Sequence, residues 1–226
     1  MRIYSVSDIR QFFIDELKDE AFTIDKTGQK TIELLGASFL ADEPAIFGTP
    51  NQEYIDKEID WYCNGSTNIN DIYGDDREPP EAWKYAANKY GEINSNYGRL
   101  IFDDLYYRQY ENVLDELSGN NDTTRRATMV YNRPSIWAEY QDSGKNDFIC
   151  TNAVTYYIRN GELQAVVQMR SNDVVFGYKN DYAWQRYVMQ LICQDLSGGA
   201  NQLKPGFLIW QVQNLHVYER HFHLVV

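Results

Sequence analysis

Cysteine is scarce in this chain, and long apolar runs are absent. The three cysteines, Cys63, Cys150 and Cys193, are odd in number and widely spaced, and no C-x-x-C pair occurs. A disulfide framework and a cysteine zinc site are therefore not expected, and a reducing setting is indicated. No run is long enough to span a bilayer, and the N-terminus lacks the apolar stretch of a signal peptide. The sequence predicts a soluble cytoplasmic protein.

Positive charge is also in short supply. The 21 lysines and arginines stand against 33 aspartates and glutamates, which gives a formal net charge of −12. Such a charge repels duplex DNA and anionic membranes, so neither is expected as a partner. An anionic small substrate would need a local basic pocket, which makes the few arginines informative.

The rest of the composition is that of one globular domain covering residues 1–226. The hydrophobic share of 43% and the aromatic share of 15% are sufficient for a sizeable core. Residues 66–80 are polar and are expected to form a surface loop, and Arg159-Asn160-Gly161 indicates a tight hairpin. We expect an α+β fold in which helices pack on a mixed sheet. Helices are expected at about 8–19, 51–63, 81–88, 105–117 and 181–196, and strands at about 30–41, 127–131, 148–158, 162–169 and 207–217.

Seven separated motifs carry most of the chemistry-bearing side chains. Arginine forks suit phosphate oxygens, and His216 and Tyr218 alternate along an expected strand, so both point to one face. In sequence order the motifs are Asp25-Lys26-Thr27-Gly28, Asp56-Lys57-Glu58-Ile59-Asp60-Trp61, Trp83 followed by Tyr97-Gly98, Asp122-Thr123-Thr124-Arg125-Arg126, Phe148-Ile149-Cys150, the segment from Arg170 to Asp181, and His216-Val217-Tyr218.

In this order the motifs resemble those of the thymidylate synthase family over about residues 25–221. The resemblance implies the α+β fold of that family and a homodimer formed through the sheet. It also implies one-carbon transfer from 5,10-methylenetetrahydrofolate to C5 of a pyrimidine nucleotide, without a metal. One departure is Lys26, because the family usually has Arg there.

Asp181 indicates which pyrimidine is the substrate. Family members that recognise uracil carry Asn at this place, since an amide offers one donor and one acceptor. A carboxylate offers two acceptors, which suits the 4-amino group of cytosine together with a protonated N3. A slip of one residue would instead bring Asn180 to the base and restore uracil. Within the family, the segments 91–98 and 170–177, and Thr151 after Cys150, most resemble the deoxycytidylate hydroxymethylases of bacteriophages, and this branch implies dCMP as substrate and a phage source.

The resemblance implies three further catalytic roles. Cys150 would be the nucleophile, because a thiolate that adds to C6 makes C5 able to attack a one-carbon donor. Glu58 would transfer protons and orient the water that adds to the exocyclic methylene. Tyr97 is either a proton-relay phenol or a packed aromatic. A cysteine, a glutamate or a tyrosine taken alone is more often a core or surface residue.

Binding roles follow from the same resemblance. The paired arginines would reach into the neighbouring subunit of the homodimer. A metal site built from His216, His221 and His223 is not expected, since no suitable partner or usual zinc spacing is present. The implied nucleotide-binding residues are Lys26, Arg125, Arg126, Arg170, Ser171, Asp181, His216 and Tyr218, and the folate would contact Trp83 and Asp173.

Two other functions remain open at this point. One is a methylating relative that acts on dUMP or dCMP and oxidises the folate. The other is a non-catalytic nucleotide-binding homologue. Family chains continue beyond the His-x-Tyr strand into a segment that closes over the folate, whereas this sequence stops at Val226. Either the site closes differently here or the sequence is short, and a looser closure would favour entry of water.

Overall fold

A seven-stranded mixed sheet forms the centre of the molecule. The structure is a computed structural model that describes residues 4–26, 28–118, 123–198 and 202–226. The strands follow the order β1-β3-β7-β6-β5-β4, and β2 pairs with β3 outside this path. Both parallel and antiparallel pairs occur, so the expected α+β class with a mixed sheet is confirmed. The strands are β1 Tyr4–Ser5, β2 Thr23–Ile24, β3 Lys30–Leu40, β4 Thr128–Val130, β5 Thr151–Arg159, β6 Glu162–Asp173 and β7 Lys204–Tyr218.

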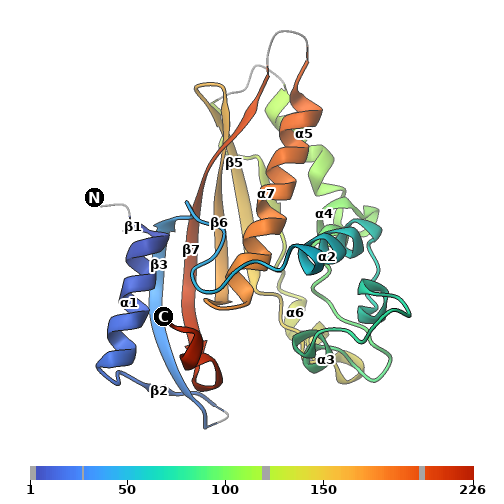
Figure 1. Ribbon diagram of the computed structural model, residues 1–226. Coiled ribbons are helices and arrows are strands. Elements are labelled where there is room, and N and C mark those ends of the chain that lie inside the picture. The colour runs from blue at the N-terminus through green and yellow to red at the C-terminus, as the bar shows by residue number, and fades with distance from the viewer. Residues whose placement is uncertain (1–3, 27, 119–122, 199–201) are drawn as a thin grey trace.

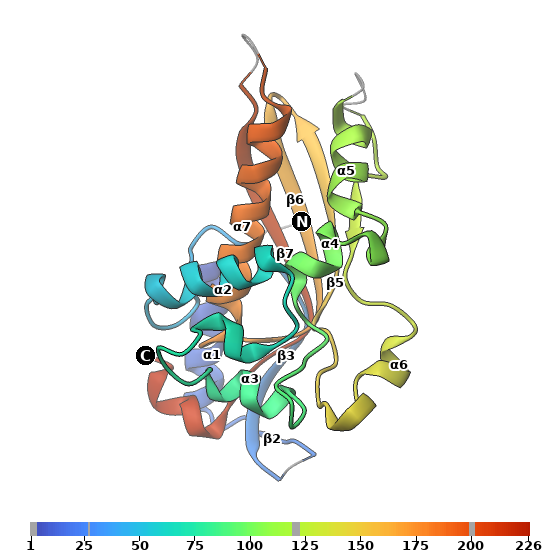
Figure 2. The same ribbon diagram turned by 90° about the vertical axis from the view of Figure 1, so that its right-hand side faces the viewer.

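Helices cover one face of this sheet. Figures 1 and 2 show α2, α4, α5 and α7 on the same side, with α1 beside β3 at one edge. No described helix is long and apolar enough to cross a membrane. The α-helices are α1 Val6–Lys18, α2 Gln52–Asn64, α3 Glu81–Ala86, α4 Tyr97–Phe102, α5 Gln109–Ser118, α6 Ile136–Glu139 and α7 Gly177–Leu196, and the 3-10 helices are η1 Ile69–Ile72, η2 Asp104–Tyr106, η3 Asp142–Gly144 and η4 Glu219–Leu224.

The register of β6 and β7 brings two of the motifs together. These strands run parallel, with Ser171 opposite Asn214 and Asp173 opposite His216. The first residues of the Arg170 segment therefore lie beside the His-x-Tyr segment, although the two segments are far apart in sequence. The β5–β6 hairpin is confirmed, with Asn160 and Gly161 both at positive φ in its turn.

Helix α2 begins and ends as its sequence predicts. The Asn51 side chain accepts a hydrogen bond from the Tyr54 N–H, and Gly65 ends the helix in the left-handed region at φ 68°. The buried face of α2 carries Ile55, Trp61 and Tyr62. Glu58 lies on that same face and is only 5% exposed. A carboxylate on an apolar helix face needs hydrogen-bond partners, because burial without them is costly.

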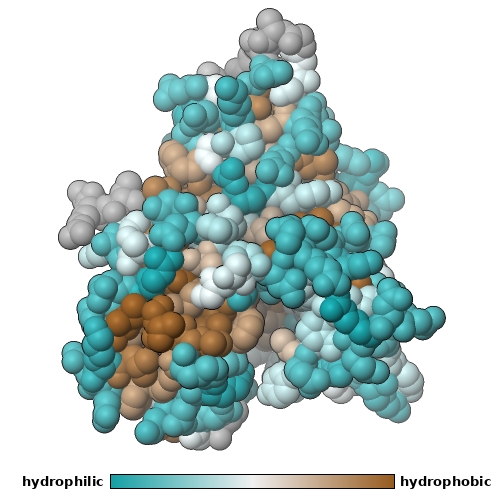
Figure 3. Space-filling model, in the orientation of Figure 1, coloured by the Kyte–Doolittle hydropathy of each residue, from teal (hydrophilic) through white to brown (hydrophobic). Residues whose placement is uncertain are grey.

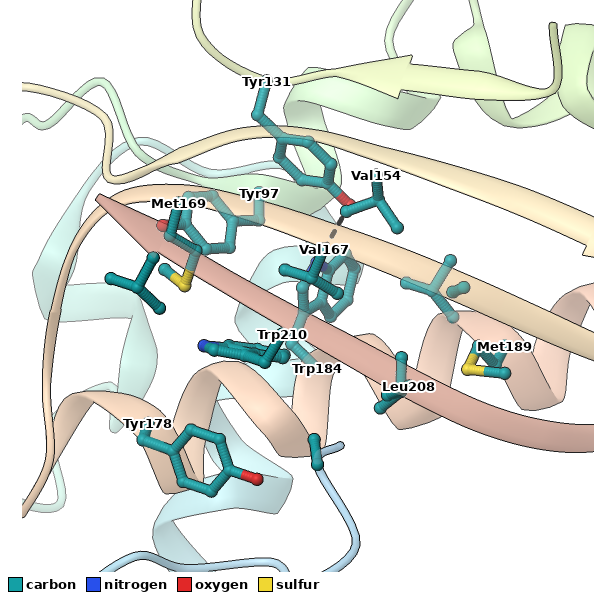
Figure 4. Packing of buried hydrophobic residues seen from close by; sticks show 14 of the residues in the cluster. Tyr97, Tyr131, Val154, Val167, Met169, Tyr178, Trp184, Met189, Leu208 and Trp210 are labelled. Atoms are coloured by element: carbon teal, nitrogen blue, oxygen red, sulfur yellow. Dashed lines mark hydrogen bonds between the residues drawn. The ribbon is translucent and has the colours of Figure 1, made fainter. Parts of the chain in front are cut away.

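Most of the molecular core lies between α7 and the sheet. Figure 4 shows Trp184 and Met189 of α7 facing Trp210 and Leu208 of β7. Trp184 and Trp210 are at most 1% exposed. In Figure 3, polar residues cover most of the visible surface, and apolar residues gather at the lower left, near α1. The dense packing behind α7 holds its first turn in place against the ends of β6 and β7.

Several expected elements are wrong in their bounds. The helix expected at 105–117 is broken, because Tyr107 and Arg108 adopt positive φ between η2 and α5. The loop expected at 66–80 contains η1, whose Ile69 and Ile72 are buried. The last helix starts at Gly177 and not at 181, because the Asp173 carboxylate accepts hydrogen bonds from the backbone at its N-terminus. Helices α4 and α6 were not expected at all.

Two cysteine placements also need correction. The strand expected at 148–158 begins at Thr151, so Cys150 lies in a bend just before β5. The sequence also predicts that Cys63 and Cys193 lie on apolar helix faces, but Cys63 is exposed and its thiol bonds to the Tyr187 hydroxyl. Cys193 is buried, as its apolar surroundings predict. The ends expected for α5 and α7 at 118–121 and 197–199 lie partly outside the described residues.

Candidate active site

Glu58 is a buried carboxyl that accepts two hydrogen bonds. The Tyr54 hydroxyl donates to Glu58 Oε1, and the Trp83 indole Nε1 donates to the same oxygen at 3.1 Å. Trp83 Nε1 also lies 2.9 Å from the Tyr54 hydroxyl. Burial raises the pKa of Glu58 to about 7, although the two hydrogen bonds oppose this rise. A carboxyl that titrates near neutral pH can both take and return a proton.

Asp181 is a second carboxyl with a raised pKa. It lies in the early part of α7 and is half-buried. Its Oδ2 accepts a hydrogen bond of 2.7 Å from Asn172 Nδ2. Burial and the charge of Glu58 raise the pKa of Asp181 to about 8, against the effect of the Asn172 bond. The two carboxyls therefore lie close enough for their charges to interact, and their proton affinities are coupled.

Cys150 is the thiol of this group. Its Sγ lies 3.5 Å from Arg170 Nη2 and 3.9 Å from the Phe148 carbonyl oxygen. Burial raises the pKa of Cys150 to about 11, while the Arg170 cation acts in the opposite direction. The charge of Asp181 adds to the rise. In the free site the thiol is thus protonated, and Arg170 is the group beside it that stabilises a thiolate.

Tyr97 lies near two of these groups, Asp181 and Cys150. Its side chain is 4% exposed. Burial raises the pKa of the Tyr97 phenol, and the charges of Asp181 and Cys150 raise it further. The ring stacks on Tyr62 with centroids 5.4 Å apart and meets Tyr131 edge-on at 5.3 Å. The phenol is therefore packed in the core and also faces the candidate site.

Arg170 holds the segment that carries the thiol. Its Nη2 donates to the Phe148 carbonyl at 2.6 Å, and its Nε donates to the Ile149 carbonyl at 3.1 Å. The guanidinium carbon lies 4.9 Å from the centre of the Phe148 ring. Ser171 follows on β6 and is half-buried. The Arg170 guanidinium therefore lies next to the Cys150 thiol.

His216 and Tyr218 share one face of β7, as expected. Their rings lie 4.9 Å apart in an edge-on arrangement. His216 is buried, and burial lowers its pKa below the usual value. The charge of Cys150 acts on the phenol of Tyr218. The His-x-Tyr segment therefore borders the same space as the thiol.

Asp173 has two different oxygens. Oδ1 accepts from the backbone N–H groups of Val175 at 2.9 Å and Phe176 at 2.6 Å. Oδ2 is buried without a hydrogen-bond partner among the described residues and lies 3.9 Å from His221 Nδ1. Burial alone would raise the pKa of Asp173, but His221 and the backbone amides lower it below its usual range. Oδ2 is thus an ionised, buried acceptor that faces the His221 ring.

The phosphate-binding residues expected from the N-terminal and arginine motifs are exposed. Lys26 is exposed in the turn between β2 and β3, and Arg125 is exposed before β4. Arg126 is also exposed, and its Nη2 pairs with Glu116 at 3.2 Å. Thr27 and Asp122 lie outside the described residues. Among the described residues, no hydrogen bond or ion pair joins these three cations to the thiol, the carboxyls or the β7 pair.

Three residues near the site were missed by the sequence analysis. Tyr54 precedes Glu58 by one helical turn, and this spacing is a signal that could have found it. Asn172 and Asp147 are recognisable only in three dimensions. Asp147 accepts from the backbone N–H groups of Asn94 and Ser95, which precede Tyr97, and its charge acts on the Cys150 thiol. In the described part of the chain, no group of three His, Cys, Asp or Glu side chains is arranged to hold a metal ion.

Comparison with known proteins defines the class. The family model described as thymidylate synthase matches residues 17–226, and the chain belongs to this family. Among curated proteins, the deoxycytidylate 5-hydroxymethyltransferases of the enterobacteria phages T4, T2 and T6 are each 51% identical over 223 residues. Those alignments cover 98% of this chain and 89% of each relative. The family expected from the motifs, and the branch within it, are confirmed.

Proposed function

We propose that this protein transfers a one-carbon unit from 5,10-methylenetetrahydrofolate to C5 of dCMP and adds water, giving 5-hydroxymethyl-dCMP and tetrahydrofolate. The observation that carries the proposal is the Asp181 carboxyl, which Asn172 holds with a hydrogen bond of 2.7 Å and which lies close enough to the Cys150 thiol and the Glu58 carboxyl for its charge to interact with theirs. The similarity to phage deoxycytidylate 5-hydroxymethyltransferases supports it. These relatives also support a phage source and action in the cytoplasm of the host.

Asp181 distinguishes cytosine from uracil by its hydrogen-bonding pattern. With a pKa of about 8, the carboxyl carries a proton in neutral solution. It then offers one donor, which suits N3 of cytosine, and one acceptor, which suits the 4-amino group. Transfer of that proton to N3 gives the ion pair of a carboxylate and a protonated ring, with the same two hydrogen bonds. Uracil presents a donor at N3 and an acceptor at position 4, which the ionised carboxylate, with two acceptors, does not match. The protonated carboxyl matches uracil only when its proton is on the oxygen that faces position 4.

Cys150 and Glu58 carry the covalent steps. The Cys150 sulfur bonds to C6 and gives C5 the character of an enolate carbon, which attacks the one-carbon donor. The folate supplies that carbon, and tetrahydrofolate leaves with the electrons of the broken C–N bond. This departure, with loss of the C5 proton and uptake of a proton by the leaving nitrogen, would leave an exocyclic methylene on C5. Glu58 would then take a proton from water as the water oxygen adds to that methylene. The C6–S bond then breaks and Cys150 is regenerated.

The binding residues divide between phosphate, sugar and folate. Arg170 lies beside the thiol, and together with Ser171, the next residue on β6, it would bind the 5′-phosphate. His216 and Tyr218 would bind the sugar hydroxyl. The folate would contact Asp173 and Trp83, as the family resemblance implies, close to the Glu58 carboxyl to which the Trp83 indole donates.

The exposed cations imply a second subunit. Arg125 and Arg126 would complete the phosphate site of the partner in a homodimer. The sheet face away from α7 supports such a contact, because a groove there is lined by Gly36, Ser38 and Gln168. Leu35 of β3 is 70% exposed. Sedimentation at several concentrations should show a dimer, and a monomer that retains full activity would contradict this part of the proposal.

Product analysis tests the proposal. Purified protein is incubated with 5,10-methylenetetrahydrofolate and, in parallel, with dCMP, CMP or dUMP, and the products are identified by mass spectrometry. We expect 5-hydroxymethyl-dCMP as the main product and no dihydrofolate, which absorbs in the near ultraviolet. Appearance of dihydrofolate with a methylated nucleotide would favour the methylating alternative. Unchanged nucleotide in all three reactions would favour a non-catalytic binding protein.

A further inference from the structure

A buried amide connects Asp181 to the molecular core. Asn172, near the end of β6, is 4% exposed, and Trp210 of β7 is fully buried. Asn172 Nδ2 donates to Asp181 Oδ2 at 2.7 Å, and Asn172 Oδ1 accepts from Trp210 Nε1 at 3.2 Å. The chain of hydrogen bonds therefore runs from the indole through the amide to the carboxyl.

Trp210 fixes the orientation of the amide. An indole N–H is a donor only, so the amide oxygen must face Trp210 and the NH2 group must face Asp181. A flipped amide would place two donors against each other at Trp210 and two acceptors against each other at an ionised Asp181. Trp210 itself is held by the core, where its ring meets Tyr178 edge-on with centroids 5.3 Å apart (Figure 4).

Gly177 leaves the space that this amide occupies. A Cβ at Gly177 would lie 3.0 Å from Asn172 Nδ2 and 3.4 Å from Asp173 Cβ. The backbone of Gly177 does not lie in the left-handed region, so its conformation is open to other residues. Close approach of the amide, and not backbone freedom, is thus the reason that glycine suits this position.

We propose that Asn172, oriented by Trp210 and accommodated by Gly177, is a positioning residue that keeps Asp181 Oδ2 as an acceptor and so places the shared proton of the carboxyl on Oδ1. Of the two oxygens of a carboxylic acid, the carbonyl oxygen is the better acceptor, so the bond from Asn172 favours the proton on the other oxygen. The carboxyl then meets the base with a defined donor and a defined acceptor.

This inference rests on the proposed recognition of cytosine by Asp181, and it makes that recognition depend on a residue that need not touch the substrate. Without Asn172, the two carboxyl oxygens become equivalent and the side chain is free to rotate. Discrimination between cytosine and uracil should then fall more than stability does. The titratable groups that face Asp181 from the packed elements are Glu58 and Tyr62 of α2, Tyr97 of α4, Tyr131 after β4 and Cys150 before β5.

The test uses Asn172→Asp, which keeps the shape of the side chain, and Asn172→Ala, which adds no charge and serves if the first variant does not fold. Calorimetry gives the Kd of dCMP and of dUMP, and steady-state kinetics give kcat/KM for dCMP across pH about 5 to 10. We expect the preference for dCMP over dUMP to fall at least about tenfold. We also expect the alkaline limb of the pH profile to move to higher pH, because both changes remove the bond that lowers the pKa of Asp181.

Asn88→Asp is the matched control. Asn88 is also buried, and its Nδ2 donates to the Glu92 carboxylate at 2.8 Å, away from the site. This variant should leave both the preference and the pH limb unchanged. If the Asn172 variants lose activity on both nucleotides equally, with an unmoved limb, the residue is only structural and the inference is overturned. If the unaltered protein does not turn over dCMP, the proposed function itself fails.

Discussion

Glu58→Gln should make the protein more resistant to alkaline pH. Burial raises the pKa of Glu58 from 4.5 to about 7, so between these values the folded protein holds a proton that the unfolded chain has released. The free energy of unfolding therefore falls as pH rises through this window. At about 1.4 kcal/mol per pKa unit, the full effect is about 3 kcal/mol. A glutamine has nearly the same shape and cannot ionise, so this loss should disappear.

The glutamine also keeps the local contacts. Its amide oxygen can accept from both Tyr54 and Trp83, as the Glu58 oxygen does. Loss of the Glu58 charge should also lower the pKa of Asp181. This second change likewise makes the variant more stable than the unaltered protein at alkaline pH. Any difference in stability between the two proteins should therefore depend on pH and not on packing.

Urea unfolding at several pH values between about 5 and 9 measures the difference. Protein concentration is kept fixed, because the stability of a dimer depends on it. We expect the variant and the unaltered protein to be similar near pH 5, and the variant to be more stable by about 3 kcal/mol near pH 8. A difference that stays constant across the range would refute the assignment of a raised pKa to Glu58.

Three substitutions test other parts of the site. Asp181→Asn offers one donor and one acceptor, so the ratio of kcat/KM for dUMP to that for dCMP should rise about ten- to one-hundred-fold, and an unchanged ratio would show that this side chain does not contact the base. Cys150→Ser should bind dCMP in calorimetry but release no tritium from the C5 position, whereas release at the normal rate would exclude the thiol as nucleophile. Tyr54→Phe removes a donor to Glu58 and should move the acid limb of the kcat profile to higher pH, and an unmoved limb would mean that Tyr54 does not act on Glu58.

Local signals in the sequence were sufficient to predict the elements whose ends are fixed by residues nearby in the sequence. Helix α2 has a capping Asn51 and a terminating Gly65, and both act within a few residues. The turn at Asn160 and Gly161 is equally local. Glu58 was placed correctly on α2 for the same reason. The family resemblance supplied the roles of these residues, which local patterns do not contain.

Features that depend on distant partners were not predictable. Helix α7 begins early because the Asp173 side chain, at the end of β6, accepts hydrogen bonds from the backbone N–H groups of Val175 and Phe176, which lead into the helix. The bend at Cys150 is followed by a register shift between Thr151 and Ala153, where β5 joins β6, and no local pattern marks it. The amide of Asn172 matters only because Trp210 reaches it from a neighbouring strand.

The origin of the product's hydroxyl oxygen tests the central claim most directly. The reaction with dCMP and 5,10-methylenetetrahydrofolate is run in water enriched in oxygen-18, and the mass of the product nucleotide is measured by mass spectrometry. If water adds at the exocyclic carbon, the product is 5-hydroxymethyl-dCMP, heavier by the mass difference between the two oxygen isotopes. A nucleotide that gains only a methyl group, without labelled oxygen and with dihydrofolate formed alongside, would contradict the account.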